Sequence, residues 1–177
     1  MIKSRALAGI AFVILSVVLF TGCRRTHSYD WQLVDLADGR FKVSFPGQPT
    51  PEAVATKSAS GGSFTSHVLR VKITDQVAYG CTWFDDPSLA GLSVEDRLNQ
   101  ARDHGISGVQ GTLLSEKRLS VQGYPARDIQ VSARGHAAFD NRIILVGTTL
   151  YSLMVADVSG NHDSANVQRF FNSLTPR

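Results

Sequence analysis

Cysteine and charge are both scarce in this sequence. Its 177 residues contain two cysteines, Cys23 and Cys81, which excludes a small fold held by several disulfides and a zinc site built from four cysteines. Charged residues make up 19% of the chain and apolar residues 43%, so the chain is neither a disordered polyelectrolyte nor a membrane protein with many spans. The length corresponds to one domain of ordinary size.

Patterns for metal, phosphate and nucleic-acid chemistry are missing as well. No two histidines lie two or four residues apart, so no local pair of metal ligands exists. The glycines at 105, 108 and 111 follow an expected helix and lack the Lys-Ser/Thr pair of a phosphate-binding loop. Beyond the N-terminal region the only adjacent basic pair is Lys117-Arg118, which is too little for a nucleic-acid surface. We therefore expect no metal, no cofactor and no nucleic-acid partner. The histidines are His27, His67, His104, His136 and His162.

The N-terminus has the pattern of an export signal. Lys3 and Arg5 open the chain, and an apolar run over residues 6–20 follows, with Ser16 as its only polar member. A basic start, an apolar run and small residues before a cleavage site are typical of secretory signal peptides. We therefore expect residues 1–22 to be a signal peptide.

Cys23 gives this signal a more specific meaning. The segment Leu19-Phe20-Thr21-Gly22-Cys23 resembles the lipobox of bacterial lipoproteins, in which small residues precede a cysteine that is lipidated and becomes the new N-terminus. The resemblance implies lipidation of Cys23, with residues 23–30 as a tether. Two alternatives stay open: an uncleaved anchor stopped by Arg24 and Arg25, and simple secretion with an incidental cysteine.

Removal of the signal would leave a nearly neutral protein on a membrane. The signal contains no charged residues other than Lys3 and Arg5, so 16 basic residues would face 15 acidic ones and the formal charge would fall from +3 to +1. Several acyl chains would attach the protein stably, because each buried CH₂ contributes about 0.8 kcal/mol. Residue 24 is not aspartate, which points to the outer membrane in bacteria that sort lipoproteins by this position.

Strand patterns dominate the first half of the expected domain. The segment 41–45 alternates strictly between apolar and polar residues, and Asp38-Gly39 forms a tight turn before it, which predicts a hairpin. Residues 48–62 have no periodicity and predict an exposed loop. The expected strands of this half cover residues 31–36, 41–45, 64–73 and 77–84.

The second half contains two expected helices. Ser93 followed by Asp96 resembles a capping box, so a helix should start there, and Gly105 should end it. Residues 164–174 have apolar side chains at i, i+3, i+4 and i+7, which is typical of an amphipathic helix. Strands are expected at 113–121, 126–133, 143–146 and 150–155. The order predicts one α+β domain over residues 31–177, with a central, mostly antiparallel sheet flanked by helices.

Five segments carry a family resemblance across this domain: Gly39–Gly47, Gly123–Asp128, Asn141–Gly147, Leu150–Leu153 and Phe170–Leu174. They are similar to a family of small bacterial exported proteins with a PsbP-like fold, which is related in shape to the photosystem II extrinsic protein and to a Ran-binding nuclear-import factor. The resemblance implies an α/β/α sandwich. Such domains are known mainly as binding or assembly modules, and the resemblance implies no catalytic residue.

Residues that could do chemistry each have a structural explanation. Cys81 shares an expected apolar strand face with Tyr79 and Trp83, so we expect it in the core and not as a nucleophile. Asp85-Asp86 should end a strand and Asp163 should begin a helix, although paired carboxylates also serve acid–base chemistry or calcium binding.

Together these patterns predict a non-catalytic binding or accessory module in the cell envelope. It would be lipid-anchored at Cys23, with the outer membrane favoured and an envelope protein as a candidate partner. Two alternatives stay open. One is an enzyme whose site is assembled from distant residues, such as Arg127, Asp128 and a histidine. The other is a carrier of a small apolar ligand between helix and sheet, which an unfilled apolar cavity would favour.

Overall fold

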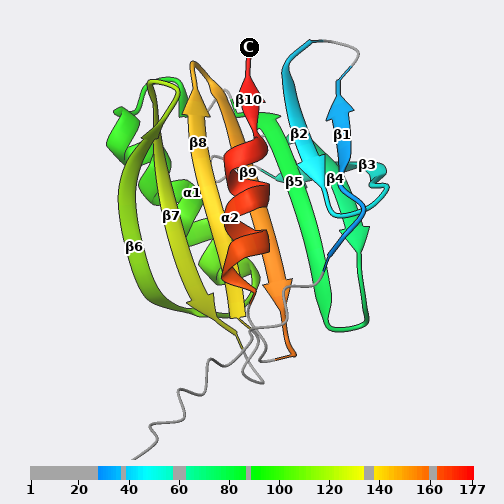
Figure 1. Cartoon of the computed structure of the whole chain (residues 1–177). Helices are drawn as coiled ribbons and strands as arrows, with labels where there is room; N and C mark the ends of the chain where they lie inside the picture. The colour runs from blue at the N-terminus through cyan, green and yellow to red at the C-terminus, as the bar shows by residue number, and fades with distance from the viewer. Residues whose placement is uncertain (1–27, 37–38, 58–62, 87–88, 134–137, 160–162) are drawn as a thin grey trace, which may run out of the picture.

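Ten strands and two helices are present in the described part of the chain (Figure 1). The computed structural model describes residues 28–36, 39–57, 63–86, 89–133, 138–159 and 163–177. The expected signal peptide and Cys23 lie outside these residues. The elements are β1 (Gln32–Asp35), β2 (Phe41–Phe45), β3 (Thr50–Lys57), β4 (Ser63–Lys72), β5 (Val77–Asp85), α1 (Val94–Gly108), β6 (Thr112–Val121), β7 (Tyr124–Ser132), β8 (Ala138–Val146), β9 (Thr149–Asp157), α2 (Ser164–Ser173) and β10 (Thr175–Pro176).

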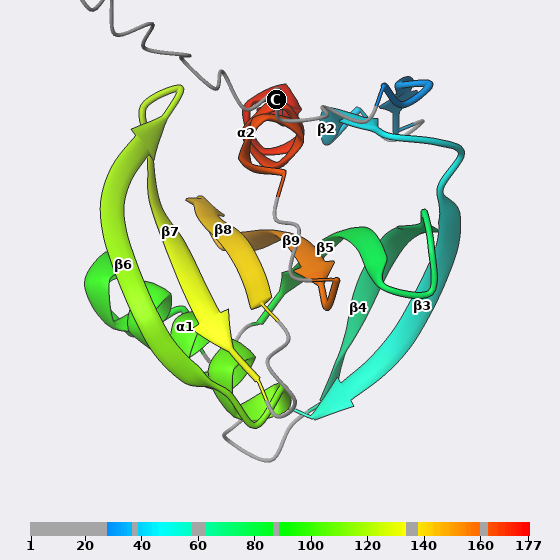
Figure 2. The ribbon, with the colours of Figure 1, turned by 60° about the horizontal axis from the view of Figure 1, so that its bottom comes forward.

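The strands form two antiparallel sheets. The larger has the order β3-β4-β5-β9-β8-β7-β6, and the smaller has the order β1-β2-β10. Helix α2 and the smaller sheet lie against one face of the larger sheet, and α1 lies against the other (Figure 1). The larger sheet is strongly curled, with α2 and β2 on the same side of it (Figure 2). The expected α+β class and antiparallel central sheet are confirmed.

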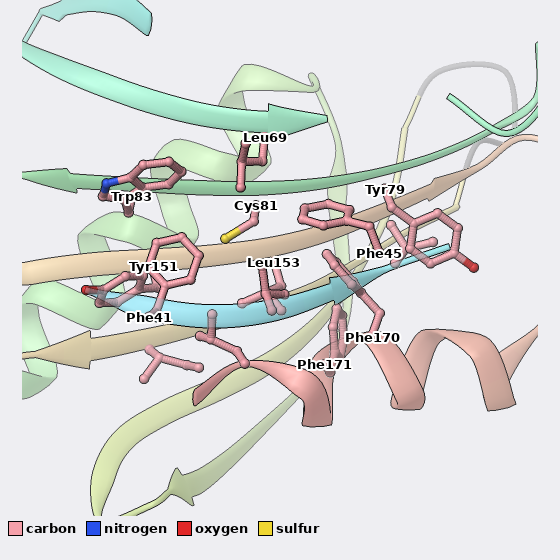
Figure 3. Packing of buried hydrophobic residues seen from close by; sticks show 14 of the residues in the cluster. Phe41, Phe45, Leu69, Tyr79, Cys81, Trp83, Tyr151, Leu153, Phe170 and Phe171 are labelled. Atoms are coloured by element: carbon pink, nitrogen blue, oxygen red, sulfur yellow. The ribbon is translucent and has the colours of Figure 1, made fainter. Parts of the chain in front are cut away.

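The main core lies under α2. Side chains alternate between the two faces of a strand, so β5 turns Tyr79, Cys81 and Trp83 toward α2 and the smaller sheet, and all three are buried. Phe170 of α2 packs on Phe45 of β2, with ring centroids 5.1 Å apart. Figure 3 shows these side chains gathered between the strands and α2. The strict alternation in the sequence therefore predicted this core correctly.

The expected loop over residues 48–62 is wrong in its first part, because Thr50–Lys57 forms β3. This strand pairs with β4 along its whole length at the edge of the larger sheet. The side chains of β3 are exposed up to Ala55. The sequence of this strand therefore does not need the alternation of apolar and polar residues that marks a half-buried strand. Backbone hydrogen bonds to β4 hold β3 in the sheet, and a pattern of apolar residues does not predict them.

The expected end of α1 at Gly105 is also wrong, since the helix continues to Gly108. Gly105 faces the sheet, where an added Cβ would lie 3.9 Å from Asn141 Nδ2, so this glycine belongs to a helix–sheet contact. The sharp turn comes at Gly111. A Cβ there would be 2.4 Å from Val131 Cγ1 and 2.8 Å from the Ser132 carbonyl oxygen, so no other residue fits this close approach.

Both expected helix starts are confirmed. Ser93 Oγ accepts a hydrogen bond from the Asp96 backbone N–H at 3.1 Å and donates to the Asp96 carboxylate at 2.7 Å. Asp163 Oδ1 accepts from the Asn166 N–H at 3.1 Å. Strand β5 ends at Asp85, as expected. In the ranges described, neither helix is long and apolar enough to cross a membrane.

Candidate functional site

Helix α1 covers only half of its face of the larger sheet. It packs on β7 and β8, while β4, β5 and β9 present the rest of that face beside it. The space between α1 and these strands is an open groove of about 610 Å³. This volume lies within the roughly 300–1,000 Å³ that is typical of small-molecule sites.

Small side chains form the floor of the groove. On β5, Ala78, Gly80 and Thr82 alternate with the large core residues and point the other way, and on β9 Ser152 and Ala156 lie beside them. An added Cβ at Gly80 would meet nothing nearer than a backbone oxygen, 3.8 Å away. The groove therefore follows the stretch of β5 from Ala78 to Thr82, where this face carries small residues, while Met154 of β9 lies beside Gly80 in the floor.

One end of the groove is aromatic and aliphatic. Phe64 of β4 and Phe84 of β5 stack there, with ring centroids 4.8 Å apart and planes at 24°. Leu89 and Leu150 are buried beside them. This end therefore offers apolar surface to an occupant.

The middle of the groove carries polar groups from α1 and β8, since Asn141 lies across β9 from the level of Gly80. Asn141 of β8 is 9% exposed, and its side-chain oxygen accepts a hydrogen bond from Ser152 Oγ at 2.9 Å. The Asn141 amide nitrogen has no hydrogen-bond partner in the part of the chain described. His104 of α1 also lines the groove, and its ring likewise makes no hydrogen bond or ion pair with a described residue. These two side chains are hydrogen-bonding groups that face the groove unused.

Ion pairs hold α1 on the sheet. Arg127 of β7 is 1% exposed, and its guanidinium donates to Asn99 Oδ1 at 2.7 Å and to Glu95 Oε1 at 2.7 Å on α1. It also donates to Glu116 of β6 at 2.5 Å. Leu98 is the buried residue of the helix. The helix is therefore attached by a charged cluster (Arg127, Glu95, Glu116 and Asn99) together with a second apolar core, in which Leu98 and its neighbours on α1 pack on the buried aliphatic residues of β7 and β8.

The structure does not bring together the residues of the enzyme hypothesis. Neighbouring residues of a strand point to opposite faces, so Arg127 lies under α1 while Asp128 lies on the α2 side, paired with Arg142 at 2.6 Å. His67 stacks on Trp83, on the core face.

Cys81 lies in the core, as expected. Its thiol is fully buried, and desolvation raises its pKa, so the reactive thiolate is disfavoured. Across the residues that the structure describes, no three His, Cys, Asp or Glu side chains cluster as metal ligands would. His27, His136 and His162 lie outside the described residues.

Sequence reasoning missed the groove, although one signal for it was present. One face of β5 carries large residues, whereas the other face carries the small residues Ala78, Gly80 and Thr82. An apolar strand with one large and one small face indicates that the small face is not filled by ordinary packing. The position of α1 beside that face could not be read from the strand alone.

No protein-family model matches this chain, and no curated protein matches it. Among solved structures, the chain is similar to the cyanobacterial PsbP protein (CyanoP) from Synechocystis sp. PCC 6803. The two are 12% identical with a TM-score of 0.55, over 86% of this chain and 95% of that one. It is also similar to PA94, a protein of unknown function from Pseudomonas aeruginosa, with 11% identity and a TM-score of 0.48 over 83% of this chain and 97% of that one. The likeness to CyanoP shows the fold, and the chain therefore has a PsbP-like fold.

Proposed function

We propose that this chain is a non-catalytic binding module of the cell envelope, which holds a small apolar ligand in the groove between α1 and the larger sheet. The observation that carries this proposal is the groove itself, with its volume of about 610 Å³ and its floor of small residues on β5 and β9. Apolar surface that lines an open groove of this size stays in contact with water, which is unfavourable unless an apolar occupant covers it.

The energetics favour a long ligand over a compact one. Burial of each CH₂ contributes about 0.8 kcal/mol. Association costs roughly 4–15 kcal/mol in lost freedom, so a ligand needs on the order of ten buried CH₂ groups before apolar burial alone retains it. A groove of this volume that is open to solvent can receive such a chain.

The arrangement of the reactive groups supports a binding role over catalysis. Arg127 and Asp128 are each committed to ion pairs on opposite faces. Cys81 is enclosed in the core. The groove offers Asn141 and His104 as hydrogen-bonding groups, without a paired nucleophile and base.

A photoreactive, clickable hexadecanol tests the groove in membrane vesicles from cells that express the full chain. We expect labelled peptides from β5, β9 and α1, and the recovered probe should be chemically unchanged apart from its crosslink. Ala78→Leu and Gly80→Leu place a larger side chain on the floor and should lower this labelling at least fivefold. The matched control is Ala55→Leu, at an exposed position of β3, which should leave it unchanged. Labelling that ignores both filling variants would contradict the proposal, and a converted probe would contradict its non-catalytic part.

The envelope location is part of the proposal and rests on the lipobox-like segment that ends at Cys23. A lipidated Cys23 with a short tether would hold the groove close to a membrane, where apolar ligands reside. Globomycin should cause an unprocessed precursor to accumulate, and wild-type protein should incorporate labelled palmitate while Cys23→Ser does not. Equal processing with and without the drug, together with no palmitate label, would contradict the anchor and leave the groove untouched.

A further inference from the structure

The first described residues of the chain lie at one end of the larger sheet. Strand β5 begins at this end with Val77 and β9 stops there at Asp157, and the two residues are register partners. The ring of Tyr29 packs edge-on against that of Tyr79, with centroids 6.4 Å apart. Figure 1 shows the described chain starting low in the view, beside β5 and the beginning of α2. We call this end of the sheet the tether end.

Exposed apolar side chains gather at the tether end. Leu113 and Leu114 at the start of β6 are 37% and 63% exposed, and Val158 just after β9 is 47% exposed. Strand register connects Leu113 across β7 and β8 to Ala156 of β9, so all three side chains lie at the same end. Adjacent strands are about 4.8 Å apart, so three spacings put β6 roughly 14 Å from β9. Apolar side chains collected in this way indicate contact with a partner or a membrane.

A β-bulge holds Leu114 at the surface. The register between β6 and β7 shifts between Leu113 and Ser115, which leaves Leu114 as an extra residue outside the pairing. Neighbouring residues of a regular strand point to opposite faces, whereas a bulge re-aims one side chain. The backbone of β6 therefore fixes Leu114 in its exposed position beside Leu113.

Ion pairs and hydrogen bonds offset charges at the tether end. Lys72 at the end of β4 pairs with Asp75 at 2.6 Å. Asp157 accepts a hydrogen bond from the backbone N–H of Ser159 at 2.8 Å. Charged groups that already have partners lose less when lipid headgroups replace part of the surrounding water.

The opposite end of the sheet carries an exposed network of charges. Arg40 pairs there with Asp85 at 3.2 Å. Asp35 pairs with Lys42 at 2.9 Å and with Arg177 at 3.2 Å. Each of these five side chains is at least 37% exposed. The two ends of the sheet therefore differ, since one presents apolar side chains and the other presents hydrated charges.

The spacing between Cys23 and Ser28 limits which end of the sheet can reach a membrane. Its five residues extend to at most roughly 18 Å, whereas the nine residues of β5 span roughly 30 Å. A domain attached through Cys23 therefore cannot turn the opposite end of the sheet against the bilayer. The proposed anchor keeps the tether end within reach of it.

The groove also extends to the tether end. Ala78 of β5, Ala156 of β9 and Val109 after α1 line it there. Val131, the register partner of Leu113, is another lining residue. The exposed leucines of β6 therefore lie beside the part of the groove that is nearest to the tether.

We propose that the tether end is a membrane-contact surface, where Leu113, Leu114 and Val158 enter the headgroup region of a lipid bilayer and the groove exchanges its ligand with that bilayer. Apolar side chains of surface-bound proteins enter a bilayer by roughly 5–10 Å. The anchor holds these few side chains at a high local concentration beside the lipid, so they need little affinity of their own. This orientation rests on the proposed function, since it requires the anchor at Cys23 and a ligand in the groove.

A matched pair of valines tests the orientation. Val158 at the tether end and Val94 at the start of α1 are 47% and 48% exposed. The first turn of α1 lies at the opposite end, where Arg97 donates a hydrogen bond to the Gly147 carbonyl oxygen at 3.2 Å. Each valine is replaced by cysteine in the full lipidated chain, which is then labelled with nitrobenzoxadiazole and reconstituted into vesicles of phosphatidylethanolamine and phosphatidylglycerol.

The introduced cysteine is the one that reacts, because the Cys81 thiol is fully buried and lipidation blocks Cys23. Doxyl-labelled lipids should quench the label in Val158→Cys and Leu114→Cys at least threefold more than in Val94→Cys. Equal quenching at the two ends of the sheet, or no quenching at positions 114 and 158, would overturn the proposal. Shielding of these labels that requires added envelope proteins would indicate a protein contact and would overturn it as well.

Charged substitutions test the exchange of the ligand. The double variant Leu114→Glu/Val158→Glu places two carboxylates on the membrane-contact surface, and Val94→Glu is the control. We expect the double variant to slow the transfer of photoreactive hexadecanol from vesicles to the groove at least fivefold, with unchanged labelling in detergent and an unchanged rate for the control. Resistance of Cys81 to alkylation reports that each variant is folded. A wild-type transfer rate in the double variant, or an equal loss of labelling in detergent, would overturn the contact.

Failure of this orientation and failure of the proposed function are distinguishable. If positions 114 and 158 are not quenched while Ala78→Leu still lowers hexadecanol labelling, the groove keeps its function without the contact surface. If Cys23 carries no lipid, the anchor fails and the orientation fails with it. If hexadecanol labels the groove neither in vesicles nor in detergent, ligand binding fails, and the exchange of ligand fails with it.

Discussion

The two faces of the larger sheet are built on different physical principles. One face is covered by α2 and the smaller sheet, and it is filled with interlocking rings such as Tyr79, Trp83 and Phe170. The other is half covered by α1, whose attachment includes the buried cation of Arg127, and its uncovered half is the groove. Aromatic packing therefore dominates the first face, whereas the second face combines an apolar core under α1 with an open groove beside the helix.

Strand β5 shows the contrast within nine residues. From Ala78 to Trp83, its large residues point to the core and its small residues point to the groove, and Phe84 then closes one end of the groove. A single strand thus serves a packed interior and an open site, because alternation lets the two sets of side chains be chosen independently. Substitutions on the two faces should consequently have very different costs.

The largest effect should come from the packed face. Phe170→Ala removes a fully buried ring that contacts Phe45 and Tyr79. We expect it to lower the free energy of unfolding by about 3–5 kcal/mol, through lost burial and the cavity left behind. Urea denaturation measures this, with Leu114→Ala as the exposed control. A loss below about 1 kcal/mol would mean that the packed face does not dominate stability.

The next effect should come from the charged cluster under α1. Glu116→Ala removes a carboxylate that pairs with the buried Arg127 and with Arg102 of α1, and it leaves Glu95 in place. We expect a loss of about 2–3 kcal/mol, since a buried cation loses a charge-assisted hydrogen bond. The control Glu52→Ala breaks the exposed pair with Arg70 and should cost below about 0.5 kcal/mol. Similar losses for the two variants would show that the cluster does not hold α1.

The sharpest comparison uses adjacent residues of β5. Cys81→Leu adds volume to a filled core and should cost about 1–3 kcal/mol. Gly80→Leu adds more volume on the open face and should change stability by less than about 0.5 kcal/mol. Chemical denaturation of the two variants side by side measures both. If Gly80→Leu proves the more costly of the two, the groove is not open.

The smallest effect concerns the strand ends where β5 meets β9. A hydrogen bond from the Thr149 hydroxyl, with Arg40 nearby, lowers the pKa of Asp85 from its usual 3.8. A lowered folded-state pKa contributes stability above the unfolded value, and this is lost as the pH falls through the folded value. Thr149→Val should therefore cost below about 1 kcal/mol near pH 6, because the site is partly exposed.

The difference between wild type and Thr149→Val should shrink as the pH falls through the pKa of Asp85 in the folded protein, which lies below 3.8. Unfolding curves at about pH 6 and at a pH below that pKa measure it. Thr56→Val is the control, since its hydroxyl faces the uncharged Ser66 hydroxyl at 2.9 Å and its effect should not depend on pH. A constant difference for Thr149→Val would argue against a titrating Asp85.

Local patterns predicted the parts of the fold that are encoded locally. The alternation at Phe41–Phe45 and the cap at Ser93 needed no knowledge of distant partners, and both are confirmed. The strand Thr50–Lys57 was missed because pairing with β4 defines it. The charged cluster joins α1, β6 and β7, so no single segment shows it.

The groove could not be predicted from the sequence for a related reason. Its floor combines Gly80 and Met154, which are register partners across β5 and β9, and this pairing joins strands that are far apart in the chain. The idea of an apolar ligand between helix and sheet could be stated from the fold class. Which helix and which strands would form the site required the three-dimensional structure.

The β5–β9 pairing also has a consequence for the order of folding. Every other strand pair in the larger sheet joins consecutive strands, whereas Asp85 and Thr149 at this junction are 64 residues apart. Two meanders, β3-β4-β5 and β6-β7-β8-β9, can therefore form locally, and their union has to wait for a long loop to close. The groove floor straddles that seam. A chain-like occupant would contact both meanders at once. It should therefore slow their separation, which lengthens the lifetime of the folded protein.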